Sequence, residues 1–417
     1  MLRSYQLTLS ATAEHLDILK TLPWHLPLEG WHHHGVRQLQ IRSGWSRHVV
    51  IFIERERRRY AIKQTSPEIA RHEIDNFRQL QKLELPTLLP VAHVAADHGK
   101  VMVSTAVGMQ METEATGFTV TQLAERVLPD SLLYRRDFGE ASRLIFLDAA
   151  VELFVLLHLH HVYWGDASLA NMLMHFSRMP NPPLRPRRVI QAVLADAETV
   201  EICTSLSQAR RQQDLDHFLE SMQWLEADLE AEGKPARAFS AAADGAYVQR
   251  RYQELYSIYL EMREFEKITQ LNIDEHLPRF YKPGASRILL KHIEEHRWYL
   301  GERSKKEIGV IEAAQDWLQN IYAPVCEFFD HSGLYDDFPS KTAADLYLDI
   351  MENKYLLSQR AGKDVGIAPA VEDYWKRCHE RDSLGHQLRR LAKMAAEILE
   401  PHASAQRRKR QKRPGTR

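Results

Sequence analysis

The chain has 417 residues, enough for two domains, and its 44% hydrophobic and 27% charged content is typical of a soluble globular protein. A formal net charge of −1 gives no overall attraction to nucleic acid or to a membrane. Three cysteines without Cys-x-x-Cys spacing, and a first segment without the apolar core of a signal peptide, argue against a disulfide framework and predict a cytoplasmic protein.

The N-terminal third is expected to form a small β-rich lobe at residues 35–107, preceded by a leader at residues 1–34 with one helix. Strands predicted at 36–41 and 49–53 enclose a polar loop that contains one glycine. Backbone N–H groups and hydroxyls in such a loop can bind phosphate. The loop residues expected to do so are Ser43, Gly44 and Ser46.

A short strand at residues 59–63 is predicted to end in Lys63. Ser66 and the proline after it predict a helix start, with the serine as N-cap and the proline at the first helical position. This helix carries Glu73, which we expect to form an ion pair with Lys63. Glu68 is the second choice for that role.

Two further strands are predicted at residues 91–95 and 101–107, separated by an Asp-His-Gly-Lys turn. The second strand would lead into a hinge that receives adenine, with Thr105 and Val107 as the contact residues. Residues 108–135 are then expected to contain the hinge and a short helix.

Residues 108–235 are predicted to form a larger, mainly helical lobe. Its most apolar helix, at residues 140–161, is interrupted by charged side chains, so we expect no transmembrane segment. A later helix begins near Asp214 and Asp216. One of these two is expected to accept hydrogen bonds from a catalytic loop, and Asp214 is the first choice.

That loop is predicted from the string Trp-Gly-Asp-Ala-Ser-Leu-Ala-Asn, in which Asp166 and Asn171 are five positions apart. A second aspartate, Asp196, follows a predicted strand. This is the layout of a phosphoryl-transfer site, in which the first aspartate accepts a hydroxyl proton and the asparagine and second aspartate hold Mg²⁺.

With Lys63, Glu73, Asp166, Asn171 and Asp196 in this order, the chain resembles the protein-kinase-like superfamily over roughly residues 35–235. It is similar to the aminoglycoside-phosphotransferase and lipopolysaccharide-kinase branch. Its Trp-Gly-Asp-x-Ser-Leu-x-Asn and Asp-Ala-Glu-Thr strings look like those of an uncharacterised bacterial kinase-like group that carries a C-terminal helical domain of unknown function.

The resemblance implies an α+β fold with two lobes, a small antiparallel β lobe and a helical lobe, followed by an all-α C-terminal domain. It also implies binding of ATP and Mg²⁺, with Lys63 holding the phosphates and Glu73 holding Lys63. The implied activity is phosphate transfer to a hydroxyl of a small-molecule, sugar or lipid-linked acceptor.

Two departures from the family pattern favour an alternative. Trp164 stands where the family usually has histidine, and the phosphate loop has a single glycine. The alternative is a non-catalytic, pseudokinase-like scaffold that binds nucleotide and whose helical domain and basic tail bind a partner.

Residues 245–400 are predicted to form a helical domain that contains a repeat. Residues 296–310 align with 353–367 at an offset of 57 (353 − 296), and each copy is expected to fold as a helix, a turn and a helix. Trp298 and Trp317 are expected to pack the helix pairs.

Two arginines at matched positions of the repeat, Arg303 and Arg360, are expected to cap helices or to pair with Asp316 and Asp373. Residues 401–417 are rich in Lys and Arg and are expected to be a disordered tail. Such a tail could contact a polyanion, either nucleic acid or anionic lipid.

Overall fold

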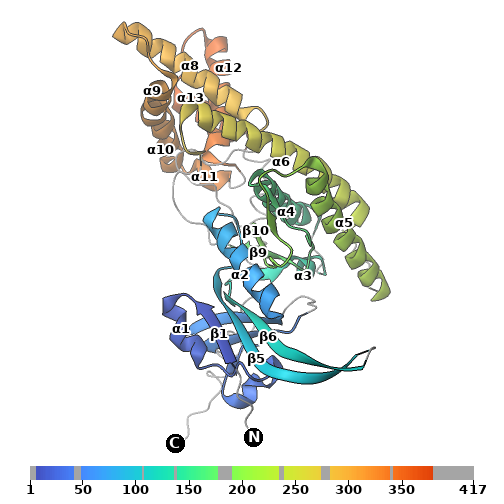
Figure 1. Cartoon of the computed structure of the whole chain (residues 1–417). Coiled ribbons are helices and arrows are strands. Elements are labelled where there is room, and N and C mark those ends of the chain that lie inside the picture. Colours follow the sequence, from blue (N-terminus) through green and yellow to red (C-terminus); the bar gives the residue numbers. More distant parts are fainter. Residues whose placement is uncertain are drawn as a thin grey trace, which may run out of the picture. The chain divides into compact units, whose positions relative to one another are not determined.

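The computed structural model describes residues 6–41, 48–105, 108–135, 139–176, 190–233, 239–273, 282–338 and 341–378. The chain divides into two compact units (Figure 1). The first comprises Met1–His175 and Gln191–Tyr247, and the second comprises Phe176–Ile190 and Val248–Arg417.

The first unit contains a six-stranded sheet in the order β1-β5-β6-β4-β3-β2, and all neighbouring strands are antiparallel. Helix α2 (Pro67–Lys82) packs on strands β5 and β6 (Figure 1). The strands are β1 (Gln6–Ala11), β2 (Arg37–Gln38), β3 (Val50–Arg55), β4 (Arg58–Thr65), β5 (Pro90–Thr105) and β6 (Gly108–Gln122).

The N-terminal segment belongs to this sheet and does not form a separate leader. Strand β1 pairs with β5, from Gln6 opposite Asp97 to Ala11 opposite Ala92. It is followed by α1 (Ala13–Lys20) and the 3₁₀ helix η1 (Leu28–His34). The rings of Trp24 and Trp31 are fully buried and lie 5.2 and 6.4 Å from the ring of Phe118 in β6. The aromatic side chains of this segment therefore complete the core of the small lobe.

The expected hairpin at residues 91–107 is wrong. The chain runs through the Asp-His-Gly-Lys stretch as one long strand, β5, with a shift of register between Asp97 and Lys100. Residues 108–122, expected to begin the hinge, form the returning strand β6. Glycine beside polar residues is common both in turns and at β-bulges. The composition of this stretch therefore does not distinguish a turn from a bulge.

The larger lobe of the first unit is built around α4 (Glu140–Leu159), which is buried along most of its length and apolar on nearly all sides. Strand β9 (Met172–Phe176) lies between β10 and β7 in a small sheet, and β8 pairs with β11. The other elements are β7 (Val127–Pro129), α3 (Asp130–Tyr134), β8 (Val162–Tyr163), β10 (Ile190–Leu194), β11 (Glu201–Ile202), α5 (Gln208–Ala231) and the first residues of α6 (Ala241–Thr269).

The described part of the second unit is helical. Its elements after α6 are α8 (Ala285–Ser304), α9 (Val310–Trp317), the π-helical turn η2 (Leu318–Tyr322), α10 (Ala323–His331), α11 (Leu334–Asp337), α12 (Ala343–Ala361) and α13 (Ile367–Cys378). In the parts of the chain that the structure describes, no helix combines the length and the apolar character needed to cross a membrane.

The repeat corresponds to two helix pairs, α8 with α9 and α12 with α13. The first helix of each pair ends at a left-handed residue, Lys305 with φ 53° and Gly362 with φ 67°, and these two are 57 positions apart (362 − 305). The same offset relates two side-chain contacts. His296 Nε2 lies 2.6 Å from Asp316, and Asn353 Nδ2 lies 3.0 Å from Asp373.

The contacts of the repeat differ from two expectations. Asp316 is bound by His296 and Asn320, and Asp373 by Asn353 and Arg377, in place of the direct pairing expected with Arg303 and Arg360. Trp317 is 1% exposed and packs the helix pair, as expected, but Trp298 is 61% exposed. Both tryptophans lie on amphipathic helices, and only the packing of the partner helix decides which face is covered.

Candidate functional site

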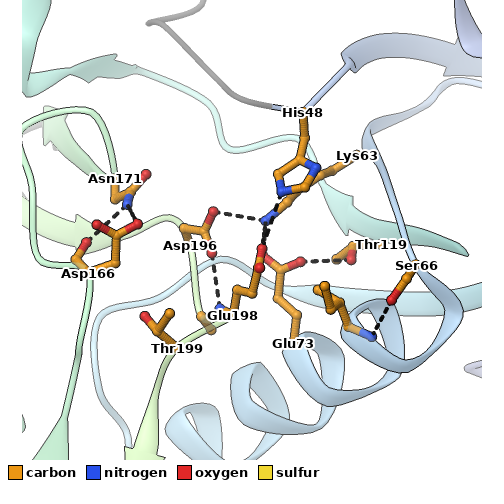
Figure 2. A network of polar contacts seen from close by, with 12 residues as sticks. His48, Lys63, Ser66, Glu73, Thr119, Asp166, Asn171, Asp196, Glu198 and Thr199 are labelled. Atoms are coloured by element: carbon orange, nitrogen blue, oxygen red, sulfur yellow. Dashed lines mark hydrogen bonds and ion pairs between the residues drawn. The ribbon is translucent and has the colours of Figure 1, made fainter. Parts of the chain in front are cut away.

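Lys63 lies in the middle of the sheet, where β4 is flanked by Val50 of β3 and Thr119 of β6. Its side chain is 13% exposed. The ammonium nitrogen contacts three carboxylates: Glu73 Oε1 at 3.1 Å, Asp196 Oδ2 at 2.8 Å and Glu198 Oε2 at 3.3 Å (Figure 2). Residues up to 135 positions apart in sequence thus meet at the ammonium group of Lys63.

Glu73 is positioned by helix α2 (Pro67–Lys82). The helix starts as predicted, since the Ser66 hydroxyl accepts the backbone N–H of Ile69 at 3.3 Å and a proline occupies the first turn. Glu73 lies on its buried face, where Thr119 Oγ1 donates a hydrogen bond to Oε2 at 2.8 Å. Glu73, and not Glu68, is therefore the partner that α2 presents to Lys63.

The start of α2 approaches β6 at Gly117. A Cβ atom at this position would lie 2.2 Å from the carbonyl oxygen of Ser66. Only glycine allows this approach, so the distance between the helix that carries Glu73 and the strand that carries Thr119 depends on this residue.

The cluster holds more negative than positive charge. Burial raises the pKa of Glu73 to about 7, and the nearby charge of Asp196 adds to the rise, while Lys63 and Thr119 oppose it. Burial lowers the pKa of Lys63, but the carboxylates of Glu73 and Asp196 outweigh it and the net shift is upward. Lys63 therefore stays protonated, and the cluster of carboxylates is favourable for a further cation.

The predicted catalytic loop brings Asp166 and Asn171 together (Figure 2). Asn171 Nδ2 donates to the carbonyl oxygen of Asp166 at 3.0 Å and to its Oδ2 at 3.2 Å. The carbonyl oxygen of Asn171 accepts the N–H of Ala195 at 2.9 Å, which fixes the loop beside the end of β10 and next to Asp196.

Asn171 and Asp196 offer amide and carboxylate oxygens, which are ligands that Mg²⁺ prefers. Within the described residues, no group of three or more His, Cys, Asp or Glu side chains is already gathered as a metal site. Mg²⁺ is usually held by one or two protein carboxylates together with substrate phosphates, so the donor set fits a metal that arrives with a nucleotide.

The side chain of Asp214 binds the backbone of the loop that carries Asp166. It is fully buried and accepts the backbone N–H groups of Trp164 at 2.9 Å and Gly165 at 2.8 Å, as well as a contact from His158 Nε2 at 3.2 Å. Asp214 was the first choice for this role. Asp216, the alternative, is exposed and accepts a hydrogen bond from Gln212 instead.

Trp164 links the catalytic loop to the segment that carries Asp196. Its indole Nε1 donates to the carbonyl oxygen of Asp196 at 3.0 Å, and its own carbonyl oxygen accepts the Thr199 hydroxyl at 2.7 Å. The residue that departs from the family pattern thus has a structural role in this chain. Its neighbour Gly165 has φ +82° and sits against Thr199, where a Cβ atom would lie 2.9 Å from a carbonyl oxygen.

The structure does not place Thr105 at the site. Thr105 pairs with Gly108, whereas Lys63 pairs with Thr119 of the same strand. These positions on β6 are eleven residues apart (119 − 108), roughly 36 Å along an extended strand. Thr105 therefore lies far from Lys63, and its contact with adenine stays a prediction that this distance does not support. Val107 and the loop residues Ser43, Gly44 and Ser46 lie outside the described residues.

Glu198 and His48 belong to the site in the structure but were not predicted from the sequence. His48 Nε2 lies 3.4 Å from Glu198 Oε2 (Figure 2). Glu198 lies in the turn that follows β10, where its backbone N–H donates to Asp196 Oδ1 at 3.0 Å, and no periodic pattern of the sequence points to it. The signal for His48 was its position at the end of the expected phosphate loop.

Comparison with known proteins identifies only parts of the chain. A family described as a domain of unknown function (DUF4032) matches residues 313–378. This match lies in the helical unit and not in residues 35–235, where the sequence resemblance was found. No curated protein matches the chain.

Among solved structures, "WaaP in complex with acyl carrier protein" is similar over 60% of this chain and 99% of that chain. The two sequences are 15% identical and the TM-score is 0.34, so this likeness carries no argument about the chain. The elements themselves give an α+β kinase-like fold: a small antiparallel lobe with its lysine and helix glutamate, a helical lobe with the aspartate loop, and a helical C-terminal region.

Proposed function

We propose that the protein is an ATP- and Mg²⁺-dependent phosphotransferase that acts on a hydroxyl of a small-molecule, sugar or lipid-linked acceptor. The observation that carries the proposal is the position of Lys63. Its Nζ lies 3.1 Å from a buried glutamate on a helix and 2.8 Å from Asp196, which follows the strand beside the catalytic loop. A cation held between these groups is well placed to bind nucleotide phosphates.

Each residue then has one task. Lys63, aimed by Glu73, binds the phosphates, and Asn171 and Asp196 offer oxygen ligands to Mg²⁺, which neutralises charge on the phosphates when it is bound. Asp166 accepts the proton of the acceptor hydroxyl. Its Oδ2 is held by Asn171 at 3.2 Å, so the base has a fixed orientation relative to the metal-binding amide.

The adenine would bind at the segment that connects the small lobe to the larger lobe. Strand β6 ends at Gln122 and β7 begins at Val127, so residues 123–126 connect the sheet to the larger lobe. We assign the hinge to these residues, which lie within the stretch 108–135 that was expected to contain it.

The alternative function is a nucleotide-binding scaffold without turnover. It is favoured by Glu198, whose carboxylate contacts Lys63 in addition to those of Glu73 and Asp196. Under this alternative the helical region and the basic tail bind a partner. The tail lies outside the described residues, and its contact with nucleic acid or anionic lipid stays a prediction.

We place the activity in the cytoplasm. All three cysteines are free in the structure, which is typical of proteins in a reducing compartment. A reporter fusion expressed in cells tests this assignment, and a signal in any other compartment would contradict it.

The first experiment measures thermal stability with ATP, with and without Mg²⁺, because a ligand that binds the native state raises its apparent stability. Wild type should show a Mg²⁺-dependent shift, and Asp196→Asn should lose it. Asp216→Asn removes an exposed carboxylate of α5 and serves as the matched control. An unchanged shift in Asp196→Asn would remove this residue from the metal site.

The second experiment separates enzyme from scaffold. Transfer of radiolabelled phosphate from ATP is measured against pools of small-molecule, sugar and lipid acceptors. Transfer that depends on Asp166 supports the enzyme. Nucleotide binding without transfer to any acceptor pool would favour the scaffold.

A further inference from the structure

We propose that Glu198 is a further functional residue of this site, whose carboxylate occupies the position on Lys63 that a nucleotide phosphate takes. The inference rests on the proposed nucleotide site and adds a regulatory contact to it. In this view Glu198 competes with the incoming phosphate and lowers the affinity for nucleotide.

Lys63 has as many carboxylate partners as it has N–H donors. An ammonium group has three N–H donors and no acceptor. The three contacts of Lys63 go to Glu73, Asp196 and Glu198, at 3.1, 2.8 and 3.3 Å. A phosphate oxygen can therefore bind Lys63 closely only after one of the three carboxylates has moved away.

The surroundings of the three carboxylates indicate which one moves. The side chain of Glu73 is 2% exposed and receives a second hydrogen bond from Thr119, so it is held in place. Asp196 makes the shortest contact with Lys63 and also accepts the backbone N–H of Glu198 at 3.0 Å. Glu198 makes the longest contact, and its side chain is 29% exposed. Water can therefore solvate the Glu198 carboxylate when it leaves.

Glu198 also contacts the loop expected to cover the phosphates. Its Oε2 lies 3.4 Å from Nε2 of His48, which stands two residues before β3 (Figure 2). One carboxylate thus joins Lys63 of β4 to the end of that loop. A phosphate that displaces Glu198 from Lys63 must therefore also disturb the contact with His48, which adds to the cost of the displacement.

The test measures the dissociation constant of ATP with Mg²⁺ for wild type, Glu198→Gln and His48→Ala by calorimetric titration. Glu198→Gln should bind ATP more tightly by roughly two- to fivefold, the range expected for a partly exposed ion pair. His48→Ala should change affinity in the same direction. The double variant should gain less than the product of the single effects, because the two side chains share one contact.

Glu201→Gln is the matched control. Glu201 is exposed on β11 and pairs with Arg210 Nη2 at 2.8 Å, so the variant removes a negative charge nearby without touching Lys63. Its ATP affinity should equal that of wild type. An equal gain in Glu201→Gln and Glu198→Gln would mean that net charge alone explains the effect, which overturns the proposal.

Two other results overturn the proposal. Weaker ATP binding in Glu198→Gln would mean that Glu198 binds the nucleotide or its metal. An unchanged dissociation constant would mean that Glu198 does not compete. The same titrations with inorganic pyrophosphate test the competition without a nucleotide. If wild type binds no ATP, the proposed function fails, whereas tighter pyrophosphate binding by Glu198→Gln would still support the competition at Lys63, and equal pyrophosphate binding would reject it.

Discussion

Asp214 Oδ1 accepts the backbone N–H of Gly165 at 2.8 Å, across 49 residues of sequence. The contact places the loop that carries Asp166 on the first turns of α5. The carboxylate of Asp214 is fully buried, and its second oxygen accepts the backbone N–H of Trp164. The orientation of the catalytic loop therefore depends on one buried side chain of the larger lobe.

Asp214→Ala should lower the free energy of unfolding by about 2–4 kcal/mol, because it leaves two loop N–H groups without their acceptor and each buried unsatisfied group costs about 1–3 kcal/mol. Urea unfolding followed by circular dichroism measures the change. Asp216→Ala, two residues along the same helix and exposed, should stay within about 0.5 kcal/mol of wild type. Equal losses in both variants would show that Asp214 has no special part in holding the loop.

Asp166→Ala should keep nucleotide binding and lose phosphate transfer by roughly 10²–10⁴-fold, the usual range for a positioned general base. Turnover is measured under saturating ATP, and binding is checked by titration. Asp216→Ala is again the control and should retain wild-type turnover. Retention of full activity by Asp166→Ala would exclude this residue from the chemistry.

Gly117→Ala should destabilise the small lobe by about 1–3 kcal/mol, because the added methyl group overlaps the backbone of Ser66 and must push α2 away from β6. The shift also moves Glu73 away from Lys63, so ATP affinity should fall. Gly30→Ala is the matched control, since nothing lies within 4 Å of its Cβ position. It should be neutral or raise the stability by up to about 1 kcal/mol. A Gly117→Ala protein as stable as the control would contradict the close approach.

Trp317→Ala should cost about 3–5 kcal/mol of stability, the range for a buried tryptophan. Trp298→Ala removes the same side chain from an exposed position of the other helix in the pair and should change stability by less than about 0.5 kcal/mol. Thermal unfolding of both variants, followed by the helical signal, gives the comparison. A large loss in Trp298→Ala would mean that its side chain is covered in solution.

Cys326 should be the slowest of the three thiols to react with a disulfide reagent at pH 8. Burial raises the pKa of its thiol from 9.0 to about 12, and the thiolate is the reactive form. Cys203 and Cys378 are only partly buried and should react first. The Cys326→Ala protein should show the same fast phase as wild type. A slow phase that persists in this variant would show that Cys203 or Cys378, and not Cys326, is the slow thiol.

The raised pKa of the Cys326 thiol also makes the free energy of unfolding depend on pH. The pKa of Cys326 is higher in the folded than in the unfolded chain, so its contribution to stability is present below pH 9 and is lost as the pH rises toward 12. Cys326→Ala should show a smaller loss of stability over this range than wild type.

The sequence by itself located the elements that carry the site. The Ser-Pro start of α2 and the apolar strand before Lys63 are local signals, and short-range chemistry determines them. Because these signals act within one element, the predicted helix start was found at the expected residue. The order of Lys63, Glu73, Asp166, Asn171 and Asp196 along the chain was likewise readable.

Other features depended on neighbours that the sequence does not reveal. Strand β1 is a short edge strand, and its partner among the described strands, β5, lies about 85 residues further along the chain. The Asp-His-Gly-Lys stretch forms a bulge in place of a turn because β6 continues to pair beyond it. Trp298 and Trp317 both lie in the paired helices α8 and α9, and the packing of the helix pair covers one and exposes the other.

The sequence thus determined which residue types stand at the ends of which elements, because capping and periodicity act over a few residues. The tertiary structure decided which of them meet. Lys63 contacts Asp196 across 133 residues and Glu198 across 135, and the Glu198 contact follows from no local pattern. Its place at the site is set by the packing that brings the end of β10 to the middle of β4, since a side chain can contact only what the fold places within reach.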